Sequence, residues 1–168
     1  EVPGLDDGDE LDKAGLQLVE GRLQAAVLFI PLTPQLHLAQ RRTQPAFGKL
    51  TERLRRKDPS EIFASAISLH EQMQGWLAFL NRARSPSQIV LAYSELEELG
   101  RSFFEMNVLS FSDDAQEHFD ALRKRQIRIG TMDLRIASIA LVEDATVLTA
   151  NTIDFEKVPG LRIDDWTR

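Results

Sequence analysis

The sequence contains no cysteine, and this absence removes several classes of site. A disulfide framework, a zinc–thiolate centre and a thiol nucleophile are all excluded. Long apolar runs are also missing, since the longest, Ala25–Ile30, is much too short to cross a bilayer as a helix. Glycine-rich phosphate-binding signatures and a serine-triad pattern are absent, so nucleotide hydrolysis and serine chemistry have no support. We therefore expect a protein without membrane spans that works in a reducing cytoplasm.

The charge of the chain is acidic in sum and uneven in distribution. A net charge of −6 over 168 residues argues against a protein that coats nucleic acid non-specifically. Residues 1–22 are acidic and weakly patterned, so we expect a poorly ordered arm there and one domain over residues 23–168. The stretch 41–57 is basic instead, and there a phosphate backbone such as RNA could be steered. The alternative is a solvated helix face. The candidate steering residues are Arg41, Arg42, Arg53 and Arg56.

Short apolar runs alternate with helical patterns along the whole domain. The expected strands are Gln24–Ile30, Ile62–Ile67, Val108–Phe111, Thr146–Thr149 and Leu161–Ile163. The expected helices between them are Pro45–Arg56, Ser68–Arg84, Ser85–Met106, a helix that begins at Asp113, and Asp133–Asp144. Strands that alternate with helices pair in parallel through right-handed crossovers. The pattern predicts an α/β fold, a three-layer α/β/α sandwich around a central parallel sheet of four or five strands.

Two serines mark the starts of neighbouring helices. Ser68 and Glu71 have the S-x-x-E spacing of a capping box, which predicts Ser68 as the N-cap. Ser85 is followed by Pro86, which is the usual order of an N-cap and a first-turn proline. Since few residues join the two helices, we expect them to pack as an antiparallel hairpin.

Three acids, Glu71, Asp133 and Asp154, each follow an apolar, strand-like run and lie near the start of a helix. In an open α/β sheet the carboxyl ends of the strands share one edge, where ligands bind. Carboxylates gathered there would repel one another unless a cation neutralised them, and oxygen ligands suit Mg²⁺ or Mn²⁺. Each acid also has a purely structural interpretation. Glu71 would complete its capping box, Asp133 would favour the helix dipole, and Asp154 lies at a cap-like spacing from Asn151.

Three segments of the chain resemble a known family. The segments Ile62–Trp76, Gly130–Ser138 and Thr146–Leu161 resemble the second, third and final acidic motifs of PIN domains, particularly VapC-type toxins of bacterial toxin–antitoxin pairs. The resemblance covers residues 45–168. It implies a PIN-like fold and an Mg²⁺- or Mn²⁺-dependent endoribonuclease that forms a homodimer and is held inactive by a cognate antitoxin. It also implies metal-binding and catalytic roles for Glu71, Asp133 and Asp154, with Thr33, Thr149 and Asn151 as polar supports of the substrate phosphate.

The first acidic motif of that family is degenerate in this chain. The segment Pro31–Pro34 keeps Thr33, but Leu32 stands where PIN domains have an aspartate. Leucine cannot ligate a cation, so the resemblance predicts a weakened metal site. It leaves three alternatives. The domain is a catalytically inactive PIN-like domain that binds protein, or an acid of the N-terminal arm replaces the missing aspartate, or residues 1–35 are not the native sequence of this segment.

Overall fold

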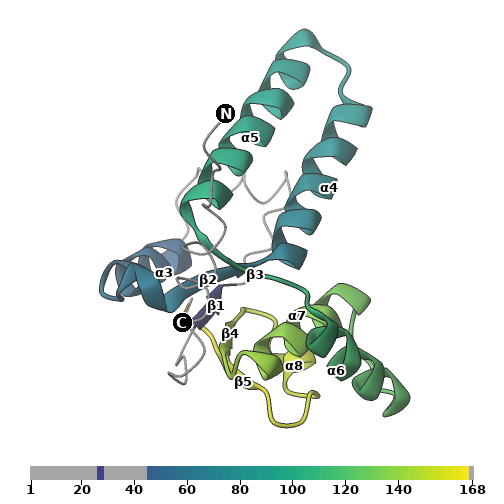
Figure 1. Ribbon diagram of the computed structural model, residues 1–168. Helices are drawn as coiled ribbons and strands as arrows, with labels where there is room; N and C mark the ends of the chain where they lie inside the picture. The colour runs from purple at the N-terminus through teal and green to yellow at the C-terminus, as the bar shows by residue number, and fades with distance from the viewer. Residues whose placement is uncertain (1–25, 29–44, 167–168) are drawn as a thin grey trace, which may run out of the picture.

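A parallel sheet forms the centre of the computed structural model, which describes residues 26–28 and 45–166 (Figure 1). The strand order is β3-β2-β1-β4-β5, and every neighbouring pair is parallel. The strands are β1 (Ala26–Leu28), β2 (Ile62–Ser65), β3 (Asn107–Leu109), β4 (Thr146–Leu148) and β5 (Arg162–Asp164). The predicted acidic arm, Leu32, Thr33, Arg41 and Arg42 lie outside the described residues.

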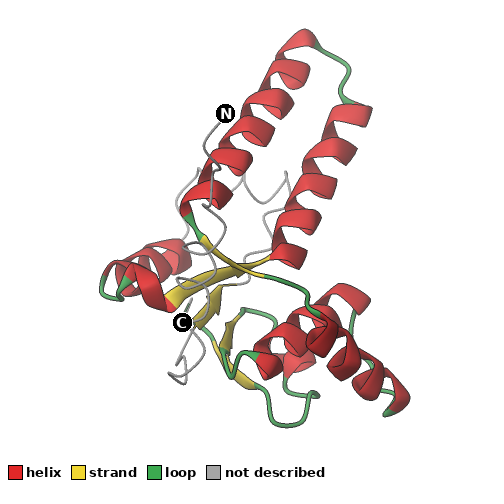
Figure 2. Ribbon diagram, viewed as in Figure 1, coloured by secondary structure: helices red, strands yellow, loops and turns green. Residues whose placement is uncertain are grey.

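Helices connect the strands and flank the sheet (Figure 2). They are α3 (Pro45–Arg55), α4 (Ala66–Arg82), α5 (Pro86–Glu105), α6 (Asp113–Lys124), α7 (Thr131–Val142) and α8 (Thr152–Phe155), with a 3-10 turn at Pro59–Glu61. The predicted α/β fold with a central parallel sheet is confirmed. No helix in the described part of the chain is both long and apolar enough to span a membrane.

Alternate residues of the strands supply the two apolar layers. Phe63 and Val147 face the cluster that α6 and α7 build. The next residue in each strand faces the other side: Ala64 packs in the cluster of α4 and α5, and Leu148 packs against Leu50 of α3. This period of two is the geometry of a strand covered on both faces, and it explains why the strands read as short, continuous apolar runs.

The start of α4 differs from the sequence prediction. Ser65, at the end of β2, is the N-cap, because its backbone is extended and its Oγ accepts the Ser68 N–H at 2.9 Å. Ser68 therefore lies in the first helical turn, and the predicted capping box between Ser68 and Glu71 is wrong. At α5 the prediction is confirmed, since Ser85 is the N-cap and forms a capping box with Gln88.

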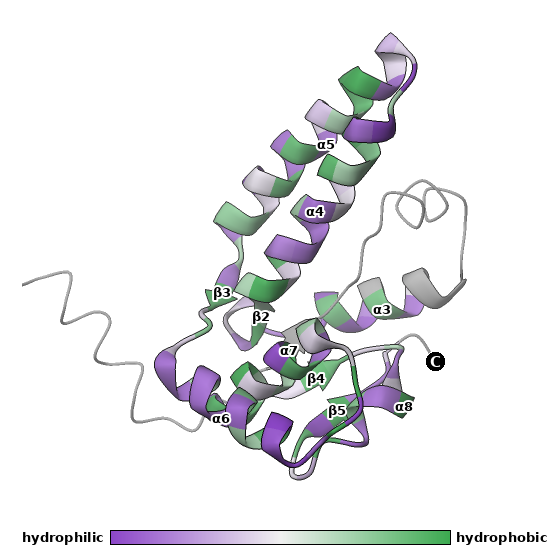
Figure 3. Ribbon diagram, turned by 90° about the vertical axis from the view of Figure 1, so that its right-hand side faces the viewer, coloured by the Kyte–Doolittle hydropathy of each residue, from purple (hydrophilic) through white to green (hydrophobic). Residues whose placement is uncertain are grey.

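The two helices α4 and α5 form the predicted antiparallel pair and extend away from the sheet (Figure 1). Their inner contacts include Trp76, Leu99 and Phe103, all of which are buried. On the other side of the molecule α6 is amphipathic (Figure 3), with Ala115 and Phe119 buried and its polar residues outward. The helical layers thus cover the two faces of the sheet, and the carboxyl edge of the sheet remains available to the side chains of the candidate site.

Candidate functional site

The three acids come from three different helices. Glu71 lies in the second turn of α4, which follows β2, and Asp154 lies in α8, which follows β4. Asp133 is in the first turn of α7, which starts after a loop. The strand-like run expected just before Asp133 is therefore not a strand. The start of α7 itself brings Asp133 to the other acids.

Glu71 and Asp133 are half-buried and electrostatically coupled. Burial raises the pKa of Glu71, and the nearby charge of Asp133 raises it further. Burial likewise raises the pKa of Asp133, with a smaller contribution from the charge of Asp154. The Oε2 atom of Glu71 is buried and has no hydrogen-bond partner among the described residues. A carboxylate oxygen in that state lacks the compensation that buried charges normally have.

A glycine makes room for the Asp133 carboxylate. Gly130 is the N-cap of α7 and provides no side-chain cap. A Cβ atom at Gly130 would lie 3.2 Å from Oδ2 of Asp133, so the carboxylate lies directly over this backbone position. Because glycine has no side chain, position 130 leaves space at the start of α7 for the carboxylate of Asp133.

Asp154 has a different environment, in which both carboxylate oxygens are engaged. Lys157 Nζ donates to Oδ1 at 2.5 Å, and Asn151 Nδ2 donates to Oδ2 at 2.9 Å. The hydrogen bond from Lys157, followed by that from Asn151, lowers the pKa of Asp154 below its usual value. Lys157 Nζ also contacts the carbonyl oxygen of Arg128 at 3.4 Å. The sequence reasoning missed Lys157, although its spacing of three residues from Asp154 could have revealed it.

The predicted supporting residues fall into two groups. Thr149 is 5% exposed, and its Oγ1 accepts the Asn151 backbone N–H at 2.9 Å, which fixes the turn before α8. Asn151 is the N-cap of α8, but its side chain makes no cap hydrogen bond and binds Asp154 instead. Arg53 and Arg56 are exposed on and just after α3, and Arg56 pairs with Glu52. Since α3 packs on the face opposite to α7, these arginines do not lie among the acids.

The arrangement suits a cation in part. Within residues 26–28 and 45–166, no three His, Asp or Glu side chains form a group that could hold one metal ion. The pair Glu71 and Asp133 nevertheless has the donor chemistry of a divalent-ion site: hard oxygens, mutual repulsion and one buried oxygen without a partner. Asp154 is close enough to raise the pKa of Asp133, yet it is itself neutralised by Lys157.

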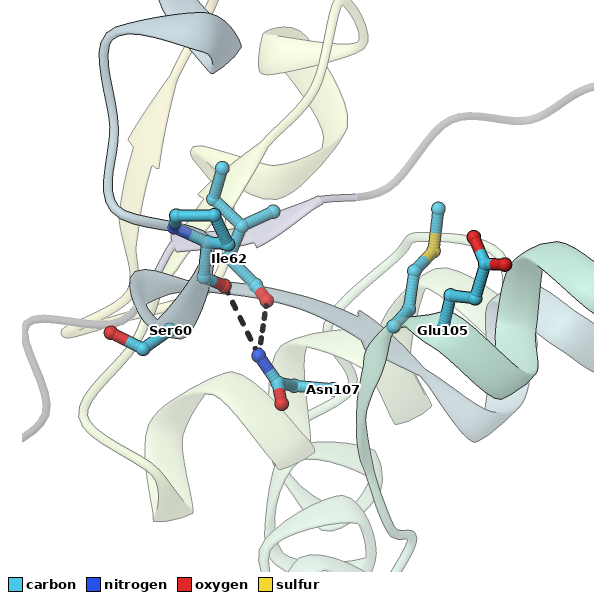
Figure 4. Close-up of a pocket in the computed structure, with 6 residues that line it drawn as sticks. Ser60, Ile62, Glu105 and Asn107 are labelled. Atoms are coloured by element: carbon cyan, nitrogen blue, oxygen red, sulfur yellow. Dashed lines mark hydrogen bonds between the residues drawn. The ribbon is translucent and has the colours of Figure 1, made fainter.

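A separate pocket lies at the opposite end of the strands (Figure 4). Its volume is ≈ 440 Å³, and Pro59, Ser60, Ile62, Glu105, Met106 and Asn107 line it. The side chain of Asn107 donates to the carbonyl oxygens of Pro59 and Ile62 at 3.1 and 3.3 Å. Since β2 begins at Ile62 and β3 at Asn107, this pocket is at the amino ends of the strands and is not part of the acidic site.

Comparison with known proteins gives a consistent result. The PIN domain family matches residues 36–161 of the chain. Ribonuclease VapC2 of Rickettsia felis is 28% identical over 111 residues, which is 64% of this chain and 75% of that protein.

Solved structures show the same fold. The structure of VapBC2 from Rickettsia felis bound to a promoter DNA fragment is 24% identical, with a TM-score of 0.59 over 84% of this chain and 98% of that chain. FitAcB from Neisseria gonorrhoeae is 18% identical, with a TM-score of 0.63 over 84% of this chain and 97% of that one. The chain therefore shares its fold with proteins that are only 24% and 18% identical to it in sequence.

Proposed function

The chain belongs to the PIN domain family, and from this we propose that it is a VapC-type toxin nuclease that cleaves RNA with Mg²⁺ or Mn²⁺. The relative named ribonuclease VapC2 supports the substrate class and the reaction. The family match extends over most of the chain and includes Glu71, Asp133 and Asp154. These three residues are the proposed metal-binding and catalytic carboxylates.

One observation in the structure carries the proposal: Glu71 and Asp133 are held together, half-buried, at a cost to both. The pKa of each is raised by burial and by a neighbouring carboxylate, and Oε2 of Glu71 has no hydrogen-bond partner among the described residues. A folded protein retains such destabilising charges mainly where function needs them. A divalent cation between the two carboxylates would remove the repulsion and satisfy the orphaned oxygen.

The residues present would divide the work as follows. Glu71 and Asp133 would hold the ion, and Asp154 would join them from α8. When bound, a divalent ion supplies an activated water and a positive charge that stabilises the phosphate group in the transition state. Asn151, fixed by its backbone bond to Thr149, would orient Asp154 through its amide and offer that amide to the phosphate. Thr33 is proposed as a further polar support of the substrate.

The charge of α3 supports a second part of the proposal, which is the approach of RNA. Arg53 and Arg56 are exposed there, and Arg41 and Arg42 precede the helix in the sequence. Although α3 lies on the face of the sheet opposite to α7, its basic surface would attract a phosphate backbone to the protein before the RNA reaches the carboxylates. We place the nuclease in the cytoplasm, where RNA is available.

Protein partners follow from the relatives. Several similar solved structures are toxin–antitoxin complexes, including one from Klebsiella pneumoniae that is 19% identical with a TM-score of 0.56. We propose that a cognate antitoxin binds this chain and restrains its activity, and that the toxin forms a homodimer. Co-purification of the chain with the product of a neighbouring gene, followed by light scattering, tests both statements.

The decisive experiment measures metal binding and cleavage separately. Mn²⁺ is titrated into the wild type and the Asp133→Asn variant by calorimetry, and both are then incubated with a labelled RNA pool. We expect Mn²⁺ binding and Mn²⁺-dependent cleavage by the wild type, with both lost or strongly weakened in the variant. Cleavage that persists undiminished in EDTA and in Asp133→Asn would contradict the proposal.

A second proposed function is supported by a different observation, which is that Leu32 stands at the position of the family's first aspartate. A site that lacks this acid would bind the metal weakly, and the domain would then act as a catalytically inactive protein-binding module. Antitoxin binding without RNA cleavage, in the presence of millimolar Mn²⁺, would favour this alternative. A Leu32→Asp variant that gains cleavage would identify the missing acid as the cause.

A further inference from the structure

Lys157 connects two parts of the candidate site that are distant in the sequence. Its ammonium group donates to Oδ1 of Asp154 at 2.5 Å and to the carbonyl oxygen of Arg128 at 3.4 Å. Arg128 lies in the loop that leads into α7, and Asp154 lies in α8. The lysine therefore ties the loop before Asp133 to the helix that carries the third acid.

The same contact leaves Asp154 without a free carboxylate oxygen. Asn151 Nδ2 occupies Oδ2 at 2.9 Å, while Lys157 occupies Oδ1. Meanwhile Oε2 of Glu71 has no hydrogen-bond partner among the described residues. The acid of α8 is thus neutralised by a side chain, whereas no basic side chain of the described residues pairs with the acids of α4 and α7. Among the described residues no three acids form a group able to hold a metal ion.

We propose that Lys157 is a built-in counter-ion of the site, which occupies Asp154 and competes with a divalent cation for that carboxylate. This inference rests on the proposed metal-dependent function. In the metal-free protein the ammonium group stands in for part of the positive charge of an ion. With a divalent ion held by Glu71 and Asp133, Lys157 would have to release Oδ1 for the Asp154 carboxylate to take part in holding the ion. Lys157 is therefore a positioning residue that sets the metal affinity.

The chemistry of lysine fits this exchange. The ammonium group is a point charge on a flexible stem, and the side chain of Lys157 is 44% exposed, so water can take over its hydrogen bonds when it swings out. The ion pair is also partly exposed, with Asp154 at 35%, which places it among the weak surface pairs that can be broken. A fully buried pair would block the third carboxylate permanently.

The test compares the affinity of the full chain for Mn²⁺ in four proteins, by calorimetry and by the loss of the free Mn²⁺ electron paramagnetic resonance signal. The variants are Lys157→Met, Lys157→Arg and Lys49→Met. Methionine keeps the aliphatic bulk and removes the charge, whereas arginine retains the charge. Lys49 is an exposed lysine on α3, on the other side of the sheet, and it controls for the change in net charge.

We expect Lys157→Met to bind Mn²⁺ about two- to fivefold more tightly than the wild type, the range set by a partly exposed ion pair. Lys157→Arg and Lys49→Met should remain within about twofold of the wild type. Unchanged or weaker binding by Lys157→Met, or equal tightening by Lys49→Met, would overturn the inference and leave metal dependence intact. Failure of all four proteins to bind Mn²⁺ would instead remove the metal from the proposed function, and the competition with it.

Discussion

Single residues of the site have two contrasting electrostatic environments. Glu71 and Asp133 carry pKa values raised mainly by burial, so their negative charge is unfavourable in the metal-free protein. Asp154 has a lowered pKa because Lys157 and Asn151 donate hydrogen bonds to its charged form. One carboxylate is thus stabilised as an anion and two are not. The cation that would balance the site belongs beside Glu71 and Asp133.

Replacement of Asp133 with asparagine should separate stability from function. The change removes a repelled charge and keeps the shape, so we expect the melting temperature of the metal-free protein to rise by roughly 1–3 °C. RNA cleavage should fall by about 100-fold or more, since a proposed metal-binding carboxylate is lost. Differential scanning calorimetry in EDTA and a cleavage assay in Mn²⁺ measure the two effects. The matched change Asp154→Asn should not stabilise the protein, because it removes the partner of Lys157.

Gly130 offers a second test at the residue scale. Alanine fits its backbone, whose φ is −57°, but the new Cβ would lie 3.2 Å from Oδ2 of Asp133. We expect Gly130→Ala to displace the carboxylate by a few tenths of an ångström and to reduce Mn²⁺ affinity and cleavage by about 10-fold, with little loss of stability. Gly100→Ala is the control, because a Cβ there would meet nothing within 4 Å among the described residues beyond its own stretch of helix. Equal effects of the two variants on Mn²⁺ binding would refute the steric argument.

At the scale of elements, the end of β2 determines where the acid of α4 is placed. Ser65 closes the strand and caps the helix, and its buried Oγ contacts both the backbone N–H and the hydroxyl of Ser68. Because α4 starts at Ala66, Glu71 lies in the second turn, where it is close enough to Asp133 at the start of α7 for the two charges to interact. The capping serine thus positions Glu71, a proposed metal ligand, six places along the chain.

The variant Ser65→Ala tests this cap. It removes the acceptor for Ser68 N–H and leaves the buried Ser68 hydroxyl without its partner, so we expect a loss of roughly 1–2 kcal/mol in the free energy of unfolding. Ser85→Ala, at the exposed capping box of α5, should lose about 1 kcal/mol or less. Urea unfolding followed by circular dichroism measures both. A larger loss at Ser85 would show that burial of the cap does not matter.

At the scale of the whole molecule, the shifted carboxyl groups combine into a pH dependence of stability. Glu71 and Asp133 have raised pKa values in the folded protein. Their contribution to the free energy of unfolding is therefore fully present below their ordinary pKa values of 4.5 and 3.8, and it is lost as pH rises through the raised pKa values. Asp154 has a lowered pKa, and so has Asp58, the N-cap of the 3-10 turn, because its carboxylate accepts hydrogen bonds from the backbone N–H and the hydroxyl of Ser60. The contribution of both groups to stability is present above pH 3.8 and is lost as pH falls through the lowered pKa values.

We therefore expect the metal-free protein to become more stable as pH falls through the raised pKa values of Glu71 and Asp133 toward their ordinary values of 4.5 and 3.8, and less stable again in stronger acid. Urea midpoints measured across this pH range in EDTA test the expectation. In the double variant Glu71→Gln, Asp133→Asn the first rise should disappear, while the loss in strong acid should remain. A rise that persists in the double variant would assign it to other groups.

Local sequence patterns were sufficient for much of the molecule. Apolar runs and serine–proline signals predicted strands and helices to within a few residues, and the alternation of strand and helix predicted the parallel sheet. The reason is that strand period, helix period and capping depend on residues only a few positions apart. The same local motifs carried the resemblance to PIN domains, which the family match over residues 36–161 confirms.

Tertiary structure alone decided how the acids interact. The sequence placed Glu71, Asp133 and Asp154 near helix starts, but it could not show that Glu71 repels Asp133 while Asp154 is bound by Lys157. The contact between Lys157 and the Arg128 carbonyl likewise depends on how α7 and α8 are placed. These interactions join side chains that only the order of the strands and the packing of the helices bring together. The sequence determines which charged side chains are present, whereas the fold determines which group each of them contacts.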